Sequence, residues 1–211
     1  MGMGIQRRTL LTSTLATGAS LVLAGSLKAS VPAAADGLSP YERRIFEVAA
    51  RERDRIGDRL WRTDMVGIAD FAMPSWKPRF HIANLEDGTL RSYLVSHGKG
   101  SDPQHDGWLK HFSDVPGSEA TSRGAYLTCE WYKGKYGTSV RLVGLDQDNA
   151  TALERAIVMH SASYAEPSMI AKWGKIGRSQ GCFALSNDAF LDSLWRLSGG
   201  RLLFADRIGE A

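Results

Sequence analysis

The chain has 211 residues, of which 43% are hydrophobic and 23% are charged, so it has the composition of a globular domain and not of a disordered or collagen-like chain. This length fits one domain with a tail. The formal net charge of +3 comes entirely from residues 1–35, where Arg7, Arg8 and Lys28 stand without any acidic residue. The rest of the chain has equal numbers of basic and acidic side chains and lacks the positive surface that phosphate binding requires, so nucleic acid is excluded as the expected partner.

Residues 1–35 have the features of a secretory signal, in the expected order. Arg7-Arg8 precede an apolar stretch from Leu10 to Ala24, and small residues follow up to Ala35. The stretch is short and contains Thr, Ser and Gly, which disfavours a transmembrane helix. The paired arginines resemble a twin-arginine export signal, with Sec export and an uncleaved amphipathic anchor as alternatives.

We therefore expect a cleaved leader over residues 1–35 and a single domain over residues 36–211. The expected location is the periplasm, without a stable membrane anchor after cleavage.

The first element expected after the leader is an amphipathic helix from Ser39 to about Leu60. Ser39-Pro40-Tyr41-Glu42 is a capping box with proline at the first helical position. Apolar residues then recur at helical spacing, with arginines and acidic residues on the opposite face. This stripe predicts core packing.

After Asp64 the pattern changes to short β-type runs separated by glycine-rich turns. Two short helices are expected over Asn149–Ala156 and Ser186–Leu197, and a strand or turn over Arg178–Leu185. Many short strands with such turns predict a mainly β fold, a sandwich with peripheral helices. Strands are expected at Met65–Phe71, Arg79–Leu85, Leu90–His97, Ala125–Tyr132, Thr138–Leu145, Ile157–Ser161 and Leu202–Ala205, with hairpins at Asp87-Gly88 and at residues 134–137.

The chemically informative segment runs from Ala156 to Leu185. His160 ends an apolar strand, and Cys182 follows Gly181 in a turn that can expose the sulfur and present main-chain N–H groups to one point. A thiol needs a nearby base or positive charge to become a thiolate at neutral pH, and His160 and Arg178 offer these. The pair is therefore a candidate for nucleophilic catalysis.

Structural interpretations of the same residues stay open at this point. His160 is also consistent with a histidine held at a strand end, and Cys182 with a small buried hydrophobic residue. In an exported protein, a Cys129–Cys182 disulfide is an alternative that would favour a non-catalytic wall-binding module. The five histidines show no ligand spacing, so no metal site and no cofactor are expected.

The order of motifs over about residues 60–205 resembles the murein L,D-transpeptidase catalytic domain family, a subgroup of the YkuD-like L,D-transpeptidases. The central motif is His160, eighteen residues, then Ser179-Gln180-Gly181-Cys182. The other matching blocks are Ser96-His97-Gly98-Lys99-Gly100-Ser101, Phe112-Ser113 with Pro116-Gly117-Ser118, Tyr132-Lys133-Gly134-Lys135-Tyr136-Gly137, Arg141-Leu142 with Gly144-Leu145, Asn149, and Arg155-Ala156-Ile157-Val158.

The resemblance implies a cysteine enzyme that acts on tetrapeptide stems of peptidoglycan without a cofactor. Cys182 would be the nucleophile and His160 the base, and the N–H groups of Gly181 and Cys182, with Gln180, would hold the oxyanion. The carbonyl of Ser161 would orient the imidazole. Two positions depart from the wider family pattern, since Gln180 replaces a histidine and Ser161 replaces a glycine. An amine acceptor would give a 3→3 cross-link, water would give an L,D-carboxypeptidase, and carbapenems are the expected inhibitors.

Further residues are expected to contact the substrate. Arg178 would pair with a stem carboxylate or brace its loop, and Tyr126 would either place a hydroxyl near the oxyanion or pack in the core as strand tyrosines commonly do. His97 and Ser101 would line the acceptor side or fix a loop. The full expected binding set is Arg178, Ser179, Gln180, Tyr126, His97 and Ser101.

A sortase-like site around the other cysteine is the remaining alternative. His97, Cys129 and Arg141 follow the sortase order, but the signature residue between Leu127 and Thr128 is missing.

Overall fold

The computed structural model describes Met1 and residues 37–209, so the expected leader lies outside the described residues. The first helix, α1 (Pro40–Ile56), begins as expected at the Ser39 cap, with both reciprocal bonds to Glu42 present, and one turn of 3-10 helix, η2 (Gly57–Arg59), follows it. The buried residues of α1 recur at helical spacing from Ile45 to Ile56. No helix in the described part of the chain is long and apolar enough to cross a membrane.

Within residues 37–209, eight strands form one mixed sheet in the order β3-β2-β1-β8-β4-β5-β6-β7. The expected mainly β fold is confirmed, and the pairing joins all strands into a single continuous sheet. The join is made by β8, which pairs parallel with β1 and antiparallel with β4. The strands are β1 (Met65–Asp70), β2 (Phe80–Asn84), β3 (Leu90–Tyr93), β4 (Gly124–Gly134), β5 (Gly137–Gly144), β6 (Val158–Ser161), β7 (Phe183–Leu185) and β8 (Leu202–Asp206).

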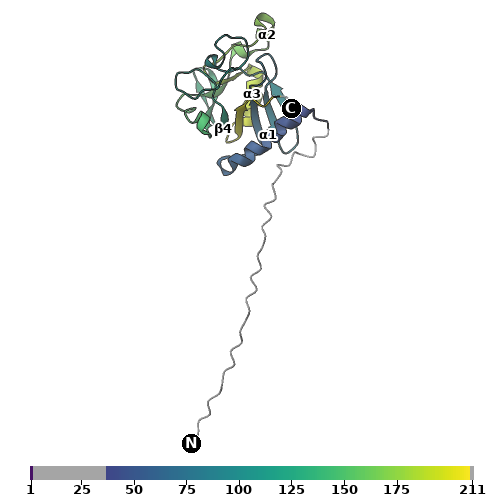
Figure 1. The fold of residues 1–211 in the computed structure, drawn as a ribbon, viewed down its shortest axis with the longest axis vertical. Coiled ribbons are helices and arrows are strands. Elements are labelled where there is room, and N and C mark those ends of the chain that lie inside the picture. The colour runs from purple at the N-terminus through teal and green to yellow at the C-terminus, as the bar shows by residue number, and fades with distance from the viewer. Residues whose placement is uncertain (2–36, 210–211) are drawn as a thin grey trace.

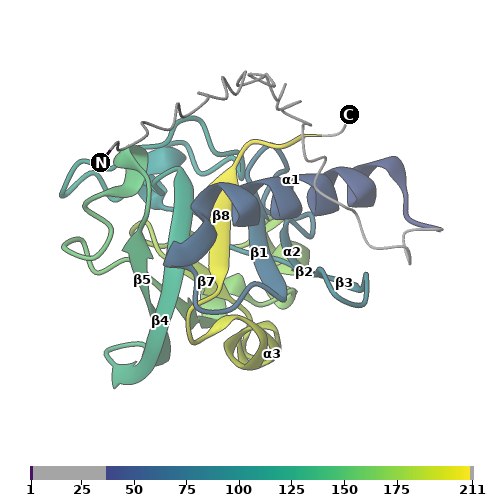
Figure 2. The same cartoon turned by 90° about the horizontal axis from the view of Figure 1, so that it is seen from below.

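Helices α1 and α3 (Asn187–Leu197) cover opposite faces of this sheet, as Figure 2 shows. On the α1 side, apolar residues such as Phe46, Ile68 and Leu202 form one core cluster. On the α3 side, Phe190 and Leu197 belong to a second cluster, which includes Tyr126 of β4, Met159 of β6 and Phe183 of β7. The described residues therefore have a main core on each face of the sheet, and alternation along each strand decides which core a side chain joins. A smaller buried cluster forms around Ala165, Ile176 and Ala184.

The connections carry short helical turns, and two of them differ from expectation. The helix expected over Asn149–Ala156 is absent: Asn149 ends η4 (Gln147–Asn149), and residues 150–156 form turns that end at Ala156 with φ of +54°. The helix α2 (Ser168–Trp173) was not expected; it has six residues, none of them buried, and no side-chain cap at its start. Figure 1 shows α2 projecting from the end of the molecule away from α1. The other 3-10 turns are η3 (Lys99–Ser101) and η5 (Ser163–Ala165).

Candidate active site

Cys182 lies directly before β7, in a tight turn. Gly181 has φ of +110°, and a Cβ there would lie 2.7 Å from the carbonyl oxygen of Ala120, so only glycine fits without strain. The hydroxyl of Ser179 closes the turn by donating to the Cys182 carbonyl at 2.6 Å and accepting from the Gly181 N–H at 3.2 Å. The turn that presents the sulfur is thus held from within by Ser179.

His160 lies on β6, which pairs parallel with β7 in the register Met159↔Phe183 and His160↔Ala184. Met159 and Phe183 belong to the α3-side core. Because successive residues alternate between faces, His160 points to the opposite face, and continuation of the register places Cys182 on that same face. Parallel pairing of two adjacent strands therefore brings the two predicted residues to one side of the sheet.

The surroundings of His160 determine which ring nitrogen carries its proton. Nδ1 lies 2.9 Å from the Ser161 carbonyl oxygen, and a carbonyl only accepts, so Nδ1 is the donor and Nε2 is left as the basic nitrogen. Tyr136 stacks on the imidazole with ring centroids 4.5 Å apart. Burial lowers the pKa of His160, and the bond to Ser161 opposes this only in part. The imidazole is therefore neutral at pH 7 and able to accept a proton.

The thiol of Cys182 is buried in this structure. Its Sγ lies 3.8 Å from the Ala156 carbonyl oxygen and makes no hydrogen bond with His160 in the described chain. Burial raises the pKa of Cys182, opposed by a hydrogen bond from the Val158 main chain and by the charge of Arg155. The resting pair is thus a neutral thiol and a neutral imidazole, and the thiol must turn toward Nε2 before it can lose its proton.

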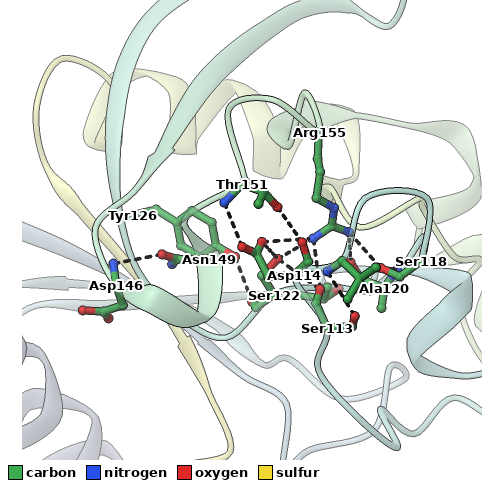
Figure 3. A network of polar contacts seen from close by, with 12 residues as sticks. Ser113, Asp114, Ser118, Ala120, Ser122, Tyr126, Asp146, Asn149, Thr151 and Arg155 are labelled. Atoms are coloured by element: carbon green, nitrogen blue, oxygen red, sulfur yellow. Dashed lines mark hydrogen bonds and ion pairs between the residues drawn. The ribbon is translucent and has the colours of Figure 1, made fainter.

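Arg155 is a charged residue of the site to which the sequence assigned no role. Its side chain is only 4% exposed, and Figure 3 shows its guanidinium among oxygens of the 113–122 loop. It donates to the Ser113 carbonyl at 3.0 Å, to the Ser122 hydroxyl at 2.6 Å and to the Ala120 carbonyl at 2.5 Å. One guanidinium nitrogen lies 3.2 Å from the Cβ position of Gly181. Arg155 therefore fixes this loop against the nucleophile turn and places a positive charge beside the thiol.

Two tyrosines complete the surroundings of the pair. Tyr136, at the β4–β5 turn, covers the imidazole, and Tyr164, in η5, is close enough to Cys182 for a thiolate there to raise its pKa. Burial is the larger cause of the raised pKa of Tyr164. The phenol of Tyr164 is therefore not ionised at neutral pH and acts as a neutral polar group.

The turn residues before Gly181 have separate contacts. Arg178 donates to the main-chain carbonyl of Asp102, which is the bracing arrangement considered from the sequence. The exposed Gln180 donates to Glu119 at 2.7 Å, and Glu119 also pairs with Lys99. The Gln180 N–H has no hydrogen-bond partner among the described residues, whereas the Gly181 N–H is engaged by Ser179. Of these two N–H groups, that of Gln180 is therefore the one that is free to donate.

The expectation for Tyr126 does not fit the structure. Its ring is fully buried in the α3-side core, 5.4 Å from the Phe183 ring, and its hydroxyl donates to the Ser122 carbonyl at 2.8 Å. Burial raises the pKa of Tyr126. A strand tyrosine with its hydroxyl satisfied in this way is a core residue, and it offers no donor to an oxyanion.

His97 and Ser101 are also interior residues that hold loops and do not line a cleft. His97 accepts at Nδ1 from the Arg79 guanidinium at 2.8 Å, which leaves Nε2 to donate to the buried Asp102 at 3.2 Å. The His97 carbonyl accepts from the Ser179 N–H at 2.9 Å. The Ser101 hydroxyl accepts from the main-chain N–H of Thr121. The loop-fixing alternative is therefore the one observed, and the His97 segment supports the turn before Cys182.

Neither the disulfide nor the sortase-like arrangement is present. Cys129 and Cys182 are both free thiols. Cys129, on β4, contacts the Leu127 carbonyl. Arg141, on β5, pairs with Glu130, the residue after Cys129. His97 is engaged instead with Arg79 and Asp102, so the three sortase-like positions do not form one site. Among residues 37–209, no group of three His, Cys, Asp or Glu side chains is placed to hold a metal ion.

A thiol, a basic imidazole nitrogen and a rigid glycine turn on one face of a sheet are the parts of a cysteine acyltransferase site. The family model for the L,D-transpeptidase catalytic domain matches residues 39–205. This match spans most of the chain, and the protein belongs to the L,D-transpeptidase catalytic domain family. No curated protein sequence matches the chain.

Solved structures similar to this chain include several L,D-transpeptidases. An L,D-transpeptidase from Mycobacterium smegmatis is 18% identical with a TM-score of 0.42, and the match covers 68% of this chain and 58% of that one. L,D-transpeptidase 3 from Mycobacterium tuberculosis, in complex with a faropenem-derived adduct, is 14% identical with a TM-score of 0.43, covering 68% and 60%. The helical cell shape determining protein Pgp2 from Campylobacter jejuni is 14% identical with a TM-score of 0.43, covering 83% and 57%. The matched region thus spans less than two thirds of each of these chains.

Proposed function

We propose that this protein is an exported L,D-transpeptidase that acts on the bond between the L-centre and D-alanine in peptidoglycan tetrapeptide stems. The family match supports the reaction class. The observation that carries the assignment of residues is the Nδ1–H bond of His160 to the Ser161 carbonyl, which leaves Nε2 as a base on the face of Cys182.

In the first half-reaction the Cys182 thiol turns from the Ala156 carbonyl toward His160 and gives its proton to Nε2. The thiolate attacks the carbonyl carbon of the scissile amide, and main-chain N–H groups of the Gln180–Cys182 turn stabilise the oxyanion. The C–N bond then breaks, and the protonated imidazole gives the proton to the leaving amine of D-alanine. The product is a thioester between the stem peptide and Cys182.

In the second half-reaction an amine from a neighbouring stem attacks the thioester carbonyl carbon and loses a proton to His160. The C–S bond breaks, the new amide forms the 3→3 cross-link, and the protonated imidazole gives the proton to the sulfur, which restores the thiol. Water in place of the amine would make the protein an L,D-carboxypeptidase with the same residues. Carbapenems should acylate Cys182, because their strained β-lactam carbonyl imitates the scissile amide.

The test is incubation of residues 36–211 with a disaccharide-tetrapeptide and analysis of the products by mass spectrometry. A cross-linked dimer with release of D-alanine supports transpeptidation, and a tripeptide alone supports hydrolysis. Cys182→Ala should abolish both products and the acyl-enzyme mass, whereas Cys129→Ala should leave activity largely unchanged, since Cys129 lies on β4 and away from His160. Activity lost only in Cys129→Ala would contradict the site.

A further inference from the structure

Three tryptophans surround a surface pocket on the α3 side of the sheet. Trp61 follows η2, Trp131 lies on β4 and Trp195 lies on α3, and they are 69%, 62% and 83% exposed. The pocket between them has a volume of about 480 Å³ and is also lined by Arg62, Glu130 and Ser198. Large apolar side chains gathered at one exposed place generally mark a binding surface.

The pocket is preformed. The main-chain N–H groups of Trp61 and Arg62 both donate to the Gly200 carbonyl, at 2.9 and 3.1 Å. Gly200 has φ of +94° and in turn donates to the Thr128 carbonyl at 2.7 Å. A Cβ on Gly200 would come within 2.6 Å of the Trp61 ring, so the indole packs against a bare main chain. The Trp61 indole therefore has a fixed orientation, and this orientation requires glycine at position 200.

An irregularity in β4 forms the opposite wall. The register with β5 shifts between Thr128 and Trp131, after which Trp131 pairs with Val140. Val140 is a member of the α3-side core, so Trp131 points to the α3 side, toward the helix that carries Trp195. The bulge thus directs Trp131 to the same side as the other two indoles.

The polar groups at the pocket favour one class of ligand. The Arg62 guanidinium makes no hydrogen bond or ion pair with any described residue, and it keeps its five donors available. Glu130 supplies carboxylate oxygens beside the indoles, with one of them already accepting from Arg141. Flat aromatic faces with charged hydrogen-bonding groups at the margin suit a ligand with apolar ring faces and polar edges. A sugar ring has this character.

From these observations we infer that the tryptophan pocket binds the glycan strand of the cell wall, through its N-acetylated amino sugars. The inference rests on the proposed action on peptidoglycan. His160 and Cys182 lie on the sheet face opposite to Trp131, so the pocket holds a strand without filling the site where the stem peptide reacts. Its effect is to keep the enzyme on the polymer.

The experiment measures binding with the inactive Cys182→Ala protein, so the result does not depend on catalysis. Tetra-N-acetylglucosamine is titrated while tryptophan fluorescence is followed, and co-sedimentation with purified sacculi is measured in parallel. Trp195→Ala, chosen because an 83% exposed side chain contributes little to folding, should weaken both by roughly three- to tenfold, the loss of one aromatic contact. Trp61→Ala should do the same. Trp173→Ala, at 61% exposure on α2, is the matched control and should bind as the parent does.

A second readout separates this inference from the proposed function. In the active protein, Trp195→Ala should leave turnover of a soluble disaccharide-tetrapeptide unchanged and slow the reaction on intact sacculi. Absence of any saccharide binding, or equal losses in Trp195→Ala and Trp173→Ala, would overturn the glycan site whether or not the enzyme is active. Concentration-dependent dimers that disappear in Trp195→Ala would instead assign the pocket to self-association.

Discussion

At the scale of single residues, His160 and Cys182 have environments that shift their pKa values in opposite directions. Burial lowers the pKa of the imidazole and raises that of the thiol, so both groups are neutral over a wide range around pH 7. A free thiolate is therefore not the resting state, and the reactive state arises when the proton moves between the two.

This arrangement predicts the pH dependence of acylation. Acylation of Cys182 by a carbapenem should lose rate on the acidic side only below the usual histidine pKa of about 6.5, because the pKa of His160 lies lower. His160→Ala should slow acylation at pH 7 by roughly 10²–10⁴-fold and recover part of it as the pH passes about 9. Mass spectrometry of the adduct over time measures both. Equal rates in the two proteins at pH 7 would show that His160 is not the base.

Two variants of Arg155 should separate the effect of its charge on Cys182 from its structural role. Its charge lowers the pKa of Cys182, and its fork of donors holds the 113–122 loop. Arg155→Gln should raise the thiol pKa further and destabilise the fold by about 3 kcal/mol, since it removes a buried charge from its partners. Arg155→Lys should keep the thiol pKa near the parent value and still lower the melting temperature. The pH dependence of iodoacetamide alkylation reports the pKa, and an identical profile in all three proteins would contradict the electrostatic role.

At the scale of elements, Arg201 and Asp64 join the beginnings of β8 and β1. The guanidinium donates two bonds to the carboxylate, at 2.8 and 2.7 Å, and these bonds hold the pKa of Asp64 below its usual value. A depressed carboxyl pKa stabilises the fold at every pH above the unfolded value of about 3.9, and this contribution is lost as the pH falls through the folded value. The pair is thus stabilising at neutral pH and absent in acid.

Asp64→Asn should accordingly lower the stability at pH 7 by roughly 1–3 kcal/mol, because a nearly buried arginine loses its charged acceptor. The difference from the parent protein should shrink as the pH falls below about 4. Thermal unfolding followed by circular dichroism from pH 3 to pH 7 measures it. A deficit that is constant over this range would mean that the carboxylate charge does not contribute.

The elements with strong local signals could be predicted from the sequence. The Ser39 cap and the apolar stripe located α1, and the turn signals located the β2–β3 and β4–β5 hairpins. Helix α2 could not be predicted in this way, since it buries no residue. The segment 149–156 has helical composition, but the chain leaves the helical region at Ala156, whose carbonyl then contacts Cys182.

Some residues of the candidate site could also be predicted from the sequence, and others could not. Cys182, Gly181 and His160 are neighbours through two adjacent strands, and short motifs mark them. Arg155 contacts a loop more than thirty residues away in the sequence, and Tyr136 stacks on the ring of His160. No local sequence pattern indicates such long-range contacts. Tyr126 is a core residue and not a site residue, because its side chain is fully buried. The sequence cannot show this, since a tyrosine in a strand has the same sequence context whether it faces a core or a cleft.

At the scale of the whole molecule, the proposed leader and the folded domain make separate predictions. If residues 1–35 direct export by the twin-arginine route, replacing Arg7 and Arg8 by lysine should leave unprocessed precursor in the cytoplasm, because the route reads the arginine pair itself. Cell fractionation and immunoblotting measure the distribution. An unchanged periplasmic yield would exclude this route and leave Sec export as the alternative.

The position of β8 also sets the order in which this protein can be assembled. Strand β8, the last one within residues 37–209, lies between β1 and β4, and among the described strands it alone joins the β3-β2-β1 half of the sheet to the β4-β5-β6-β7 half. Until residues 202–206 leave the ribosome, β1 and β4 each present an open edge, and open edges are templates for intermolecular pairing. The closing contacts also connect positions far apart in the sequence, which makes their formation slow. In a nascent chain the two halves of the sheet therefore cannot join before residues 202–206 are available, and a truncation that removes these residues takes out the central seam of the sheet and not an edge.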